Sequence, residues 1–496
     1  MLGFFSKHPD HPFADSREAK RICDEIATGD ALHALKEASA WLESIASVEG
    51  FKLAVRLERM LQLDEAASPQ ARRVGRDAIH QGRKNPSQEA RLWALARNYW
   101  QQLVTAYESV RQRLSVGEKD SAAAAPLRPL LLMRLVHARA ALLKLDQFHY
   151  ALMGGEFWSA LGAIYLEAEA EGWAQQAISL YPGHPATSIE REYLKALLFQ
   201  ASAMDSLLPV EIELAERLIA HFLPRFKLTR EVRPENVYWV DAARPVPPTR
   251  LAKLPEVNSS LRFFNGGEAL AAIEAVQAQI AAAQQIPSEI NLGGQYDTAY
   301  VSTVLEHLAM CWAPKPPMRK DARHRVKSRL IVAHGMGDIH GYLSGHLTDP
   351  ARVEAWIVDD VSLGGMSVQV PISRQDWLRV GVLVAMQPEG GTNWLLGTVR
   401  RFARISSSQG QVGTETLSKT PRAVIADADG LQTEAILLDQ PVAGEYVRMA
   451  LPAAAVEDKV ALTFELDGKR TRLHPREILV TGVDFVIVNY LVQSYN

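Results

Sequence analysis

Cysteine is scarce in this chain of 496 residues, and several other markers of particular protein classes are missing. The two cysteines, Cys23 and Cys311, are too few for a disulfide framework or a zinc ligand set, so a reducing cytoplasm is expected. No run of about 18 apolar residues occurs, as a helix crossing a bilayer would need. The formal net charge of -3 gives no general basic field. The sequence therefore predicts neither a membrane span nor nucleic-acid binding.

Catalytic fingerprints are also missing. There is no nucleophile elbow, no phosphate-binding P-loop and no dinucleotide fingerprint. The fragment GDIHG at residues 337–341 is reminiscent of part of the metallophosphoesterase signature. Such two-metal enzymes also need GDxxDR and GNH motifs to supply further ligands, and neither follows in the sequence. We therefore expect no enzyme and no cofactor, with a metallophosphoesterase-like enzyme as the weakest alternative.

Three histidines surround this fragment at intervals of six residues: His334, His340 and His346. On an extended strand they would share a face but lie too far apart to bind one metal ion, unless the glycines between them turn the chain back. We interpret the segment as strand and hairpin sequence and expect no metal.

The length of the chain exceeds what one core can hold, so we expect several domains. From Asp15 to about Phe226 apolar residues recur at intervals of three and four, for example after an expected N-cap at Asp30. This pattern predicts an all-helical domain over residues 1–230. Within it, residues 154–178 are similar to one tetratricopeptide-type unit, and a single unit favours a bundle or a degenerate array. The positions that carry this similarity are Trp158, Leu161, Gly162, Tyr165 and Ala168.

The second half has a different pattern. Residues 231–318 read as a helical and irregular junction, with helices over about Gly266–Gln285 and Thr298–Trp312 before the proline-rich APKPP. Short alternating apolar runs then predict an antiparallel β-barrel over residues 319–420 and a further β module over residues 421–496. The expected fold class is a multidomain α + β chain with an all-helical N-terminal half.

Two short motifs frame the first β segment. RVKSR contains Arg325 and Arg329, and DVSLGG contains Asp360, Ser362 and Gly365. In this combination the sequence from about Arg323 to Glu415 resembles the PilZ family of cyclic di-GMP receptors, whose signature is RxxxR followed by (D/N)xSxxG. The resemblance implies a PilZ-like barrel in a cytoplasmic second-messenger receptor. Taken singly, the motifs would be a solvated basic linker and an ordinary β-turn.

A cyclic dinucleotide carries two phosphates and two bases, and an arginine fork can pair phosphate oxygens or stack on a base. The resemblance assigns phosphate and base contacts to Arg325 and Arg329, guanine contacts to Asp360 and Ser362, and a conformational role to Gly365. Residues four apart on a strand lie roughly 13 Å apart, so we expect the arginine-bearing segment to wrap rather than extend. Additional ligand contacts are expected from Arg323, His324, Gly364, Arg400 and Arg401.

The resemblance also implies an output. Such a receptor would transmit ligand binding to a protein partner by domain rearrangement, in the control of bacterial motility, pili or biofilm formation. The helical half is a candidate for contacting that partner, whose identity the sequence does not give, nor does it give an oligomeric state. The main alternative is a protein-interaction scaffold whose PilZ-like barrel binds no ligand.

Overall fold

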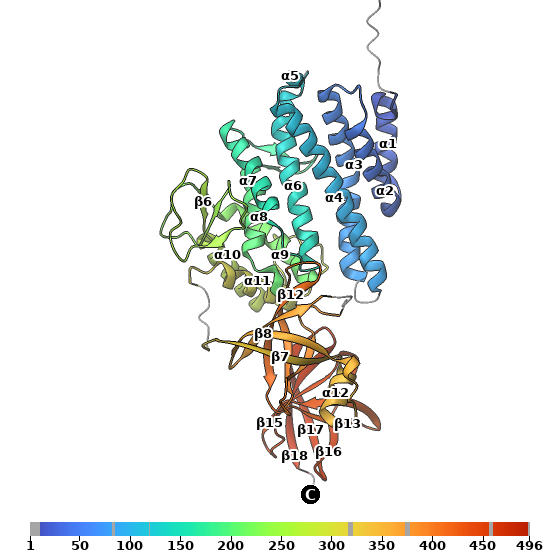
Figure 1. Cartoon of the computed structure of the whole chain (residues 1–496), viewed down its shortest axis with the longest axis vertical. Coiled ribbons are helices and arrows are strands. Elements are labelled where there is room, and N and C mark those ends of the chain that lie inside the picture. Colours follow the sequence, from blue (N-terminus) through green and yellow to red (C-terminus); the bar gives the residue numbers. More distant parts are fainter. Residues whose placement is uncertain are drawn as a thin grey trace, which may run out of the picture. The chain divides into compact units, whose positions relative to one another are not determined.

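The computed structural model describes residues 10–81, 85–118, 120–315, 321–372, 377–455 and 460–494. The chain forms two compact units, one made of Met1–His149, Met153–Met204 and Pro209–Pro317, the other of Tyr150–Leu152, Asp205–Leu208 and Met318–Asn496. Helices dominate the first unit, and the second contains two closed antiparallel barrels (Figure 1). The expected fold class is thereby confirmed. Among the residues described, no helix has both the length and the apolar character of a membrane span.

The helical unit is built around long neighbouring helices, with α3, α4 and α6 side by side (Figure 1). Helix α6 has buried residues on several of its sides, as expected for a helix packed between others, and these include the charged Arg134 and Asp146. Asp30 caps α2 as expected, since its carboxylate accepts hydrogen bonds from the main-chain N–H groups of Leu32 and His33. The helices are α1 (Ser16–Thr28), α2 (Ala31–Ser47), α3 (Leu53–Gln81), α4 (Pro86–Ser115), α5 (Ser121–Ala124), α6 (Arg128–Gln147), α7 (Gly155–Ala170), α8 (Ile189–Ala201), α9 (Pro209–Phe222), α10 (Gly267–Ala283) and α11 (Thr298–Trp312).

A buried ion pair lies in the core of this unit. Arg134 donates to Oδ2 of Asp64 at 2.6 Å, and both side chains are at most 1% exposed. The hydroxyl of Tyr107 donates to the same oxygen at 2.9 Å, and those of Tyr99 and Tyr181 donate to Oδ1 at 3.1 and 3.2 Å. Burial, together with the Asp64 carboxylate, raises the pKa of all three tyrosines, so they remain donors. The aspartate is thus fully satisfied inside the bundle.

A small antiparallel sheet completes the helical unit and was not expected from the irregular, proline-rich sequence. Its strands are β3 (Leu228–Thr229), β6 (Leu261–Phe264), β4 (Tyr238–Asp241) and β5 (Thr249–Arg250), in that order. A further pair joins β1 (Ile178–Ser179) to β2 (Ala186–Thr187). The sheet explains Gly162 of α7, because a Cβ there would collide with the main-chain oxygen of Ala242.

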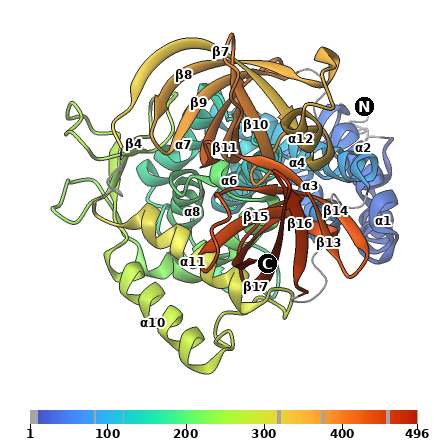
Figure 2. The same ribbon diagram turned by 90° about the horizontal axis from the view of Figure 1, so that it is seen from below.

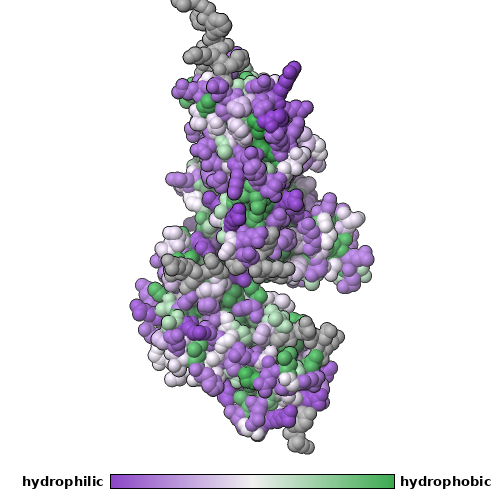
Figure 3. All heavy atoms as spheres, turned by 90° about the vertical axis from the view of Figure 1, so that its right-hand side faces the viewer, coloured by the Kyte–Doolittle hydropathy of each residue, from purple (hydrophilic) through white to green (hydrophobic). Residues whose placement is uncertain are grey.

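Figure 3 shows one face of the helical unit. Hydrophilic residues, in purple, cover most of this face, and hydrophobic residues, in green, form only narrow strips between them. The large apolar side chains of the helices are instead turned inward, where burial stabilises the bundle by about 25 cal/mol per Å² of apolar surface.

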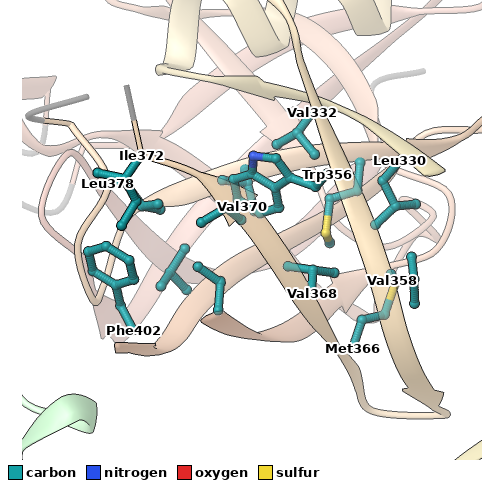
Figure 4. Close-up of a cluster of buried hydrophobic side chains, with 14 of the residues drawn as sticks. Leu330, Val332, Trp356, Val358, Met366, Val368, Val370, Ile372, Leu378 and Phe402 are labelled. Atoms are coloured by element: carbon teal, nitrogen blue, oxygen red, sulfur yellow. The ribbon is translucent and has the colours of Figure 1, made fainter. Parts of the chain in front are cut away.

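The first barrel closes in the strand order β10-β11-β12-β9-β8-β7. Alternate side chains of β7, β8 and β9 point inward and meet around the fully buried Trp356 (Figure 4). The carboxylate of Glu354 accepts one hydrogen bond from the indole of Trp356 and one from that of Trp377, both at 3.0 Å. The strands are β7 (His324–His334), β8 (Glu354–Ser362), β9 (Gly365–Pro371), β10 (Leu383–Pro388), β11 (Leu395–Arg404) and β12 (Gln409–Ser418).

The C-terminal β module is a second closed barrel, in the order β13-β14-β15-β18-β17-β16, with an apolar core of its own. Another apolar cluster joins the two barrels and includes Leu383 of the first and Ile487 of the second. The strands are β13 (Arg422–Ala428), β14 (Leu431–Leu437), β15 (Tyr446–Pro452), β16 (Leu462–Leu466), β17 (Lys469–Thr481) and β18 (Phe485–Ser494).

The segment around GDIHG is a helix, so the expected hairpin is wrong. Helix α12 (Met336–Ser344) lies against β13 and β14 of the second barrel (Figure 2). Gly335 and Gly345, both with positive φ, flank the helix and allow the chain to enter and leave it abruptly. Ile339 is fully buried in the cluster between the barrels, and its burial stabilises this short helix.

Candidate functional site

The strand register brings the two sequence motifs together on the outer face of the first barrel. Arg325 of β7 lies directly opposite Asp360 of β8, and Asp360 lies opposite Ser367 of β9. Residues opposite one another in an antiparallel pair have Cα atoms about 4.5 to 5.5 Å apart. The neighbouring pair of Val358 and Val368 points into the core, so the row containing Arg325 and Asp360 faces outward.

Arg329 starts a second outward row. It lies opposite Ile357 of β8, which lies opposite Gln369 of β9 and, through it, Gln411 of β12. The amide of Gln369 donates to the carboxylate of Asp359 at 2.8 Å. Arg325 and Arg329 are exposed, and neither side chain forms a hydrogen bond or ion pair within the described part of the chain. Both guanidinium groups are therefore available to an anion.

The expectation that the arginine-bearing segment wraps is wrong, because both arginines lie within strand β7. The strand is not regular, however. The pairing of β7 with β8 shifts register between Arg325 and Ser328, and the pairing of β8 with β9 shifts between Val358 and Asp360. Extra residues of this kind bend and twist a strand locally. The bulges, rather than a loop, determine how the two arginines are presented.

Asp360 already has a basic partner. Arg323 donates to Oδ1 of Asp360 at 2.7 Å, with the two side chains 40% and 25% exposed. A surface ion pair of this kind contributes about 0 to 1 kcal/mol, so a ligand donor can share or replace it. His324 lies opposite Val361 at the same end of β7 and is exposed. The structure therefore places Arg323 and Arg325 next to Asp360, whereas His324 belongs to the alternate row with Val361, which packs against the barrel core.

The hairpin between β8 and β9 is held tightly. Ser362 lies opposite Gly365 and its hydroxyl donates to the main-chain oxygen of Gly365 at 3.1 Å. The main-chain oxygen of Gly364 accepts from the N–H of Thr416 at 3.0 Å. A Cβ on Gly365 would collide with the main-chain oxygen of Thr414 in β12. Close approach of β12, rather than a positive φ, is thus the reason for glycine at 365.

Arg400 and Arg401 lie on β11, the strand beyond β12 from the motif strands. Arg401 belongs to the row of Arg325 through Gly413 and Ser367, but four strand spacings separate the two arginines, roughly 19 Å along the surface. Its guanidinium pairs with Asp205. Arg400 pairs with Glu415, which lies opposite Gly365. Arg400 therefore borders the hairpin, whereas the structure does not bring Arg401 to the motif arginines.

Three polar side chains between the motif residues and the β11 arginines were not predicted from the sequence: Ser367, Gln369 and Gln411. They supply a hydroxyl and two amides on the outward face of β9 and β12, and the Gln411 amide donates to the Ser367 hydroxyl at 3.4 Å. The signal was available in MSVQV, where polar residues alternate with apolar ones at the period of a strand.

The three histidines near GDIHG do not converge. His334 stacks on Trp377, with ring centroids 3.8 Å apart, and Nε2 of His340 contacts the main-chain oxygen of Val424 at 3.2 Å. Nδ1 of His346 contacts the hydroxyl of Ser344. Within the residues that the structure describes, no group of three or more His, Cys, Asp or Glu side chains is suited to hold a metal ion.

The helical unit, rather than the barrel, is similar to a known protein family. Residues 17–234 match the family model described as the N-terminal domain of the cyclic-di-GMP receptor FimW. The matched segment runs from α1 through α9 and ends before the barrels begin. No curated protein matches the chain. The match supports a cyclic di-GMP receptor, and it does so from residues outside the barrel motifs.

Proposed function

We propose that the outer face of the first barrel binds cyclic di-GMP and that this barrel is of the PilZ type. The observation that carries the proposal is the strand register, which sets Arg325 of RxxxR opposite Asp360 of DxSxxG. The family match over residues 17–234 supports the same ligand from a separate part of the chain. In this proposal the chain is a receptor and performs no catalysis.

Each group at the site has a role that its chemistry suits. Arg325 and Arg329 pair phosphate oxygens, and such charge-assisted hydrogen bonds contribute about 1.5 to 3 kcal/mol each. Asp360 accepts from N1 and N2 of guanine, and Ser362 adds a hydroxyl beside it. Gly365 keeps the hairpin close to β12. Further contacts are proposed for Arg323, His324, Gly364 and Arg400, with Arg401 the weakest candidate because Asp205 holds it.

Calorimetric titration of the full chain with cyclic di-GMP tests the proposal directly. We expect heat of binding and a dissociation constant in the micromolar range or below, equivalent to about -8 kcal/mol or better. Cyclic di-AMP, which has the same phosphates and different bases, should bind more weakly. Absence of heat for cyclic di-GMP at micromolar concentrations would refute the receptor function.

Changing Asp360 to alanine should reduce base selectivity. The variant loses the acceptor for guanine, so the preference for cyclic di-GMP over cyclic di-AMP should fall about tenfold, as expected for loss of a good base contact. Because the change also frees Arg323, the ratio of the two affinities is a cleaner readout than either affinity alone. The measurement is paired titration with both dinucleotides.

The matched control for this variant is Asp359→Ala. Asp359 is a carboxylate on the same strand, bonded to Gln369, and its removal changes the local charge equally. It should leave the ratio of the two affinities unchanged. If the Asp360 variant lost affinity for both dinucleotides by the same factor, guanine recognition by that carboxylate would be contradicted.

We also propose that ligand binding changes the arrangement of the two units, and that this change transmits the signal to a protein partner. This proposal rests on the position of the site. Strand β7, which carries both arginines, is the first strand of the second unit. Spin labels at Val116→Cys and Leu431→Cys, both at least 70% exposed and one in each unit, report the distance between the units.

The background for these labels carries Cys23→Ser and Cys311→Ser, which remove the only other thiols. Cyclic di-GMP should shift the distance distribution measured by double electron–electron resonance. The same shift should be missing when Arg325 and Arg329 are both alanine. An unchanged distribution in a protein that binds the ligand would rule out transmission by rearrangement.

A further inference from the structure

A cavity of about 170 Å³ lies inside the helical unit, where α3, α4, α6, α8 and α9 meet. Trp100, Phe148 and Phe199 form apolar parts of its wall, and the small side chains of Ala140 and Ala141 leave the space open. An apolar cavity of about 150 Å³ is enough to hold a benzene molecule. The space therefore fits one ring or an aliphatic body of similar size.

Charged side chains line the same cavity. Nζ of Lys144 donates to Glu213 at 3.0 Å, and Nζ of Lys195 lies 2.6 Å from Glu216. These carboxylates raise the pKa of Lys144 and of Lys195 against the opposing effect of burial, so both lysines remain protonated. Burial lowers the pKa of His137, which is neutral at pH 7. The lysines and glutamates thus satisfy one another and contribute no net charge.

Two arginines of α3 line the cavity in addition to these pairs, and this leaves an excess of positive charge. The guanidinium of Arg72 lies over the ring of Tyr181, 5.1 Å from its centroid, and has a weak contact with the main-chain oxygen of Ser68. Arg76 is half-buried, and its side chain has no hydrogen bond or ion pair among the residues described. A guanidinium group held in this way beside an apolar space favours an incoming anion.

We propose that this cavity binds a small organic anion. Its apolar body occupies the space between Trp100 and Phe199, and its carboxylate or phosphate pairs with the guanidinium of Arg76. Cyclic di-GMP, with two bases and two phosphates, is too large for this volume. The cavity lies in the helical unit, so the chain has a second binding site that is independent of the barrel.

Titration of the full chain with single-ring compounds tests this proposal. Benzoate and phenyl phosphate supply the two anionic groups, while toluene and benzylamine supply a neutral and a cationic control. By nuclear magnetic resonance or calorimetry we expect at least one anion to bind with a dissociation constant of about 1 mM or tighter. It should bind at least about tenfold more tightly than both controls, as one charge-assisted contact implies. The tighter of the two anions identifies the ligand as a carboxylate or a phosphate.

Variants locate the binding. Arg76→Met should weaken the anion about tenfold or more and leave toluene unaffected, because only the charge is lost. Arg73→Met is the matched control, since Arg73 is exposed on the same helix and does not line the cavity. Ala141→Phe should fill the space and abolish binding of every compound.

If Ala141→Phe does not fold, Gly75→Ala replaces it. A methyl group there enters the cavity wall at an ordinary 3.4 Å from Leu145, and alanine favours the helix. Several-fold weaker anion binding is then expected. The proposal is overturned if neither anion binds at about 10 mM, if toluene or benzylamine binds as tightly, or if Arg76→Met and Arg73→Met behave alike. Unchanged cyclic di-GMP binding in Arg76→Met keeps this result separate from the receptor function.

Discussion

Replacement of both Arg325 and Arg329 by alanine is expected to weaken cyclic di-GMP binding by about a hundredfold or more. Two charge-assisted contacts of about 1.5 to 3 kcal/mol each account for a loss of this size. Both arginines are exposed on β7, so the change should alter the free energy of unfolding by no more than about 0.5 kcal/mol. Calorimetric titration of the variant beside the wild-type chain measures the effect, and thermal unfolding checks the fold.

The matched control replaces Arg352 and Arg422. Both are exposed arginines of the same unit, in surface ion pairs with Asp338 and Asp467, and neither belongs to the rows that contain the motif. This control should bind like the wild type. Changing Arg325 and Arg329 to lysine should give intermediate affinity, because lysine keeps the charge but loses the planar fork.

Affinity of the double alanine variant within about threefold of the wild type would contradict the assignment, since that is less than 1 kcal/mol. In cells, the variant should lose any response of motility, pili or biofilm formation to cyclic di-GMP that the wild-type chain supports. A response that persists in a variant without binding would separate the cellular role from the barrel site.

Changing Asp64 to alanine is expected to have the largest effect on stability. The change leaves the buried Arg134 with only the partly exposed Glu65 as a charged partner, and it removes the acceptor of three tyrosine hydroxyls. Breaking a buried ion pair in this way costs about 3 to 5 kcal/mol. Urea unfolding, followed by a probe that reports on the helical unit, measures the loss in the full chain.

Glu65→Ala provides the comparison. Glu65 also accepts from Arg134, at 2.9 Å, but its side chain is 35% exposed, so its removal should cost about 1 kcal/mol or less. Equal destabilisation by the two variants would show that burial of the ion pair has no special weight. Asp64→Asn should fall between them, because the amide oxygen can still accept hydrogen bonds.

The fold was largely readable from the sequence because long periodic segments dominate it. The period of three to four residues gave the helical half, and alternating runs gave the barrels. The small sheet containing β4 and β6 was missed because its strands have at most four residues and form by pairing between distant segments. Helix α12 was missed because its glycines suggested turns, although Met336, Ile339 and Leu343 follow a helical spacing.

The sequence predicted which residues belong to the candidate site but not how they are arranged. Two motifs named them, but the bulges beside Arg325 and Asp360 decide which side chains share a face, and a shift of one residue would reverse that arrangement. Nothing in the sequence spacing reveals the ion pair between Arg323 and Asp360. These features depend on hydrogen bonding between strands, which local sequence patterns do not specify.

The tight hairpin at Ser362 and Gly365 has a consequence for the thermodynamics of recognition. The Gly364 carbonyl accepts a hydrogen bond from β12, and β12 lies so close to Gly365 that no side chain would fit there. The backbone beside Asp360 is therefore already fixed before a ligand binds. A base that docks there causes little loss of backbone conformational entropy. The ordering cost falls on the long arginine side chains instead, at about 0.5 to 1.5 kcal/mol each. Selectivity for the base would therefore come from a preorganised edge, and adaptability toward the phosphates from mobile cations.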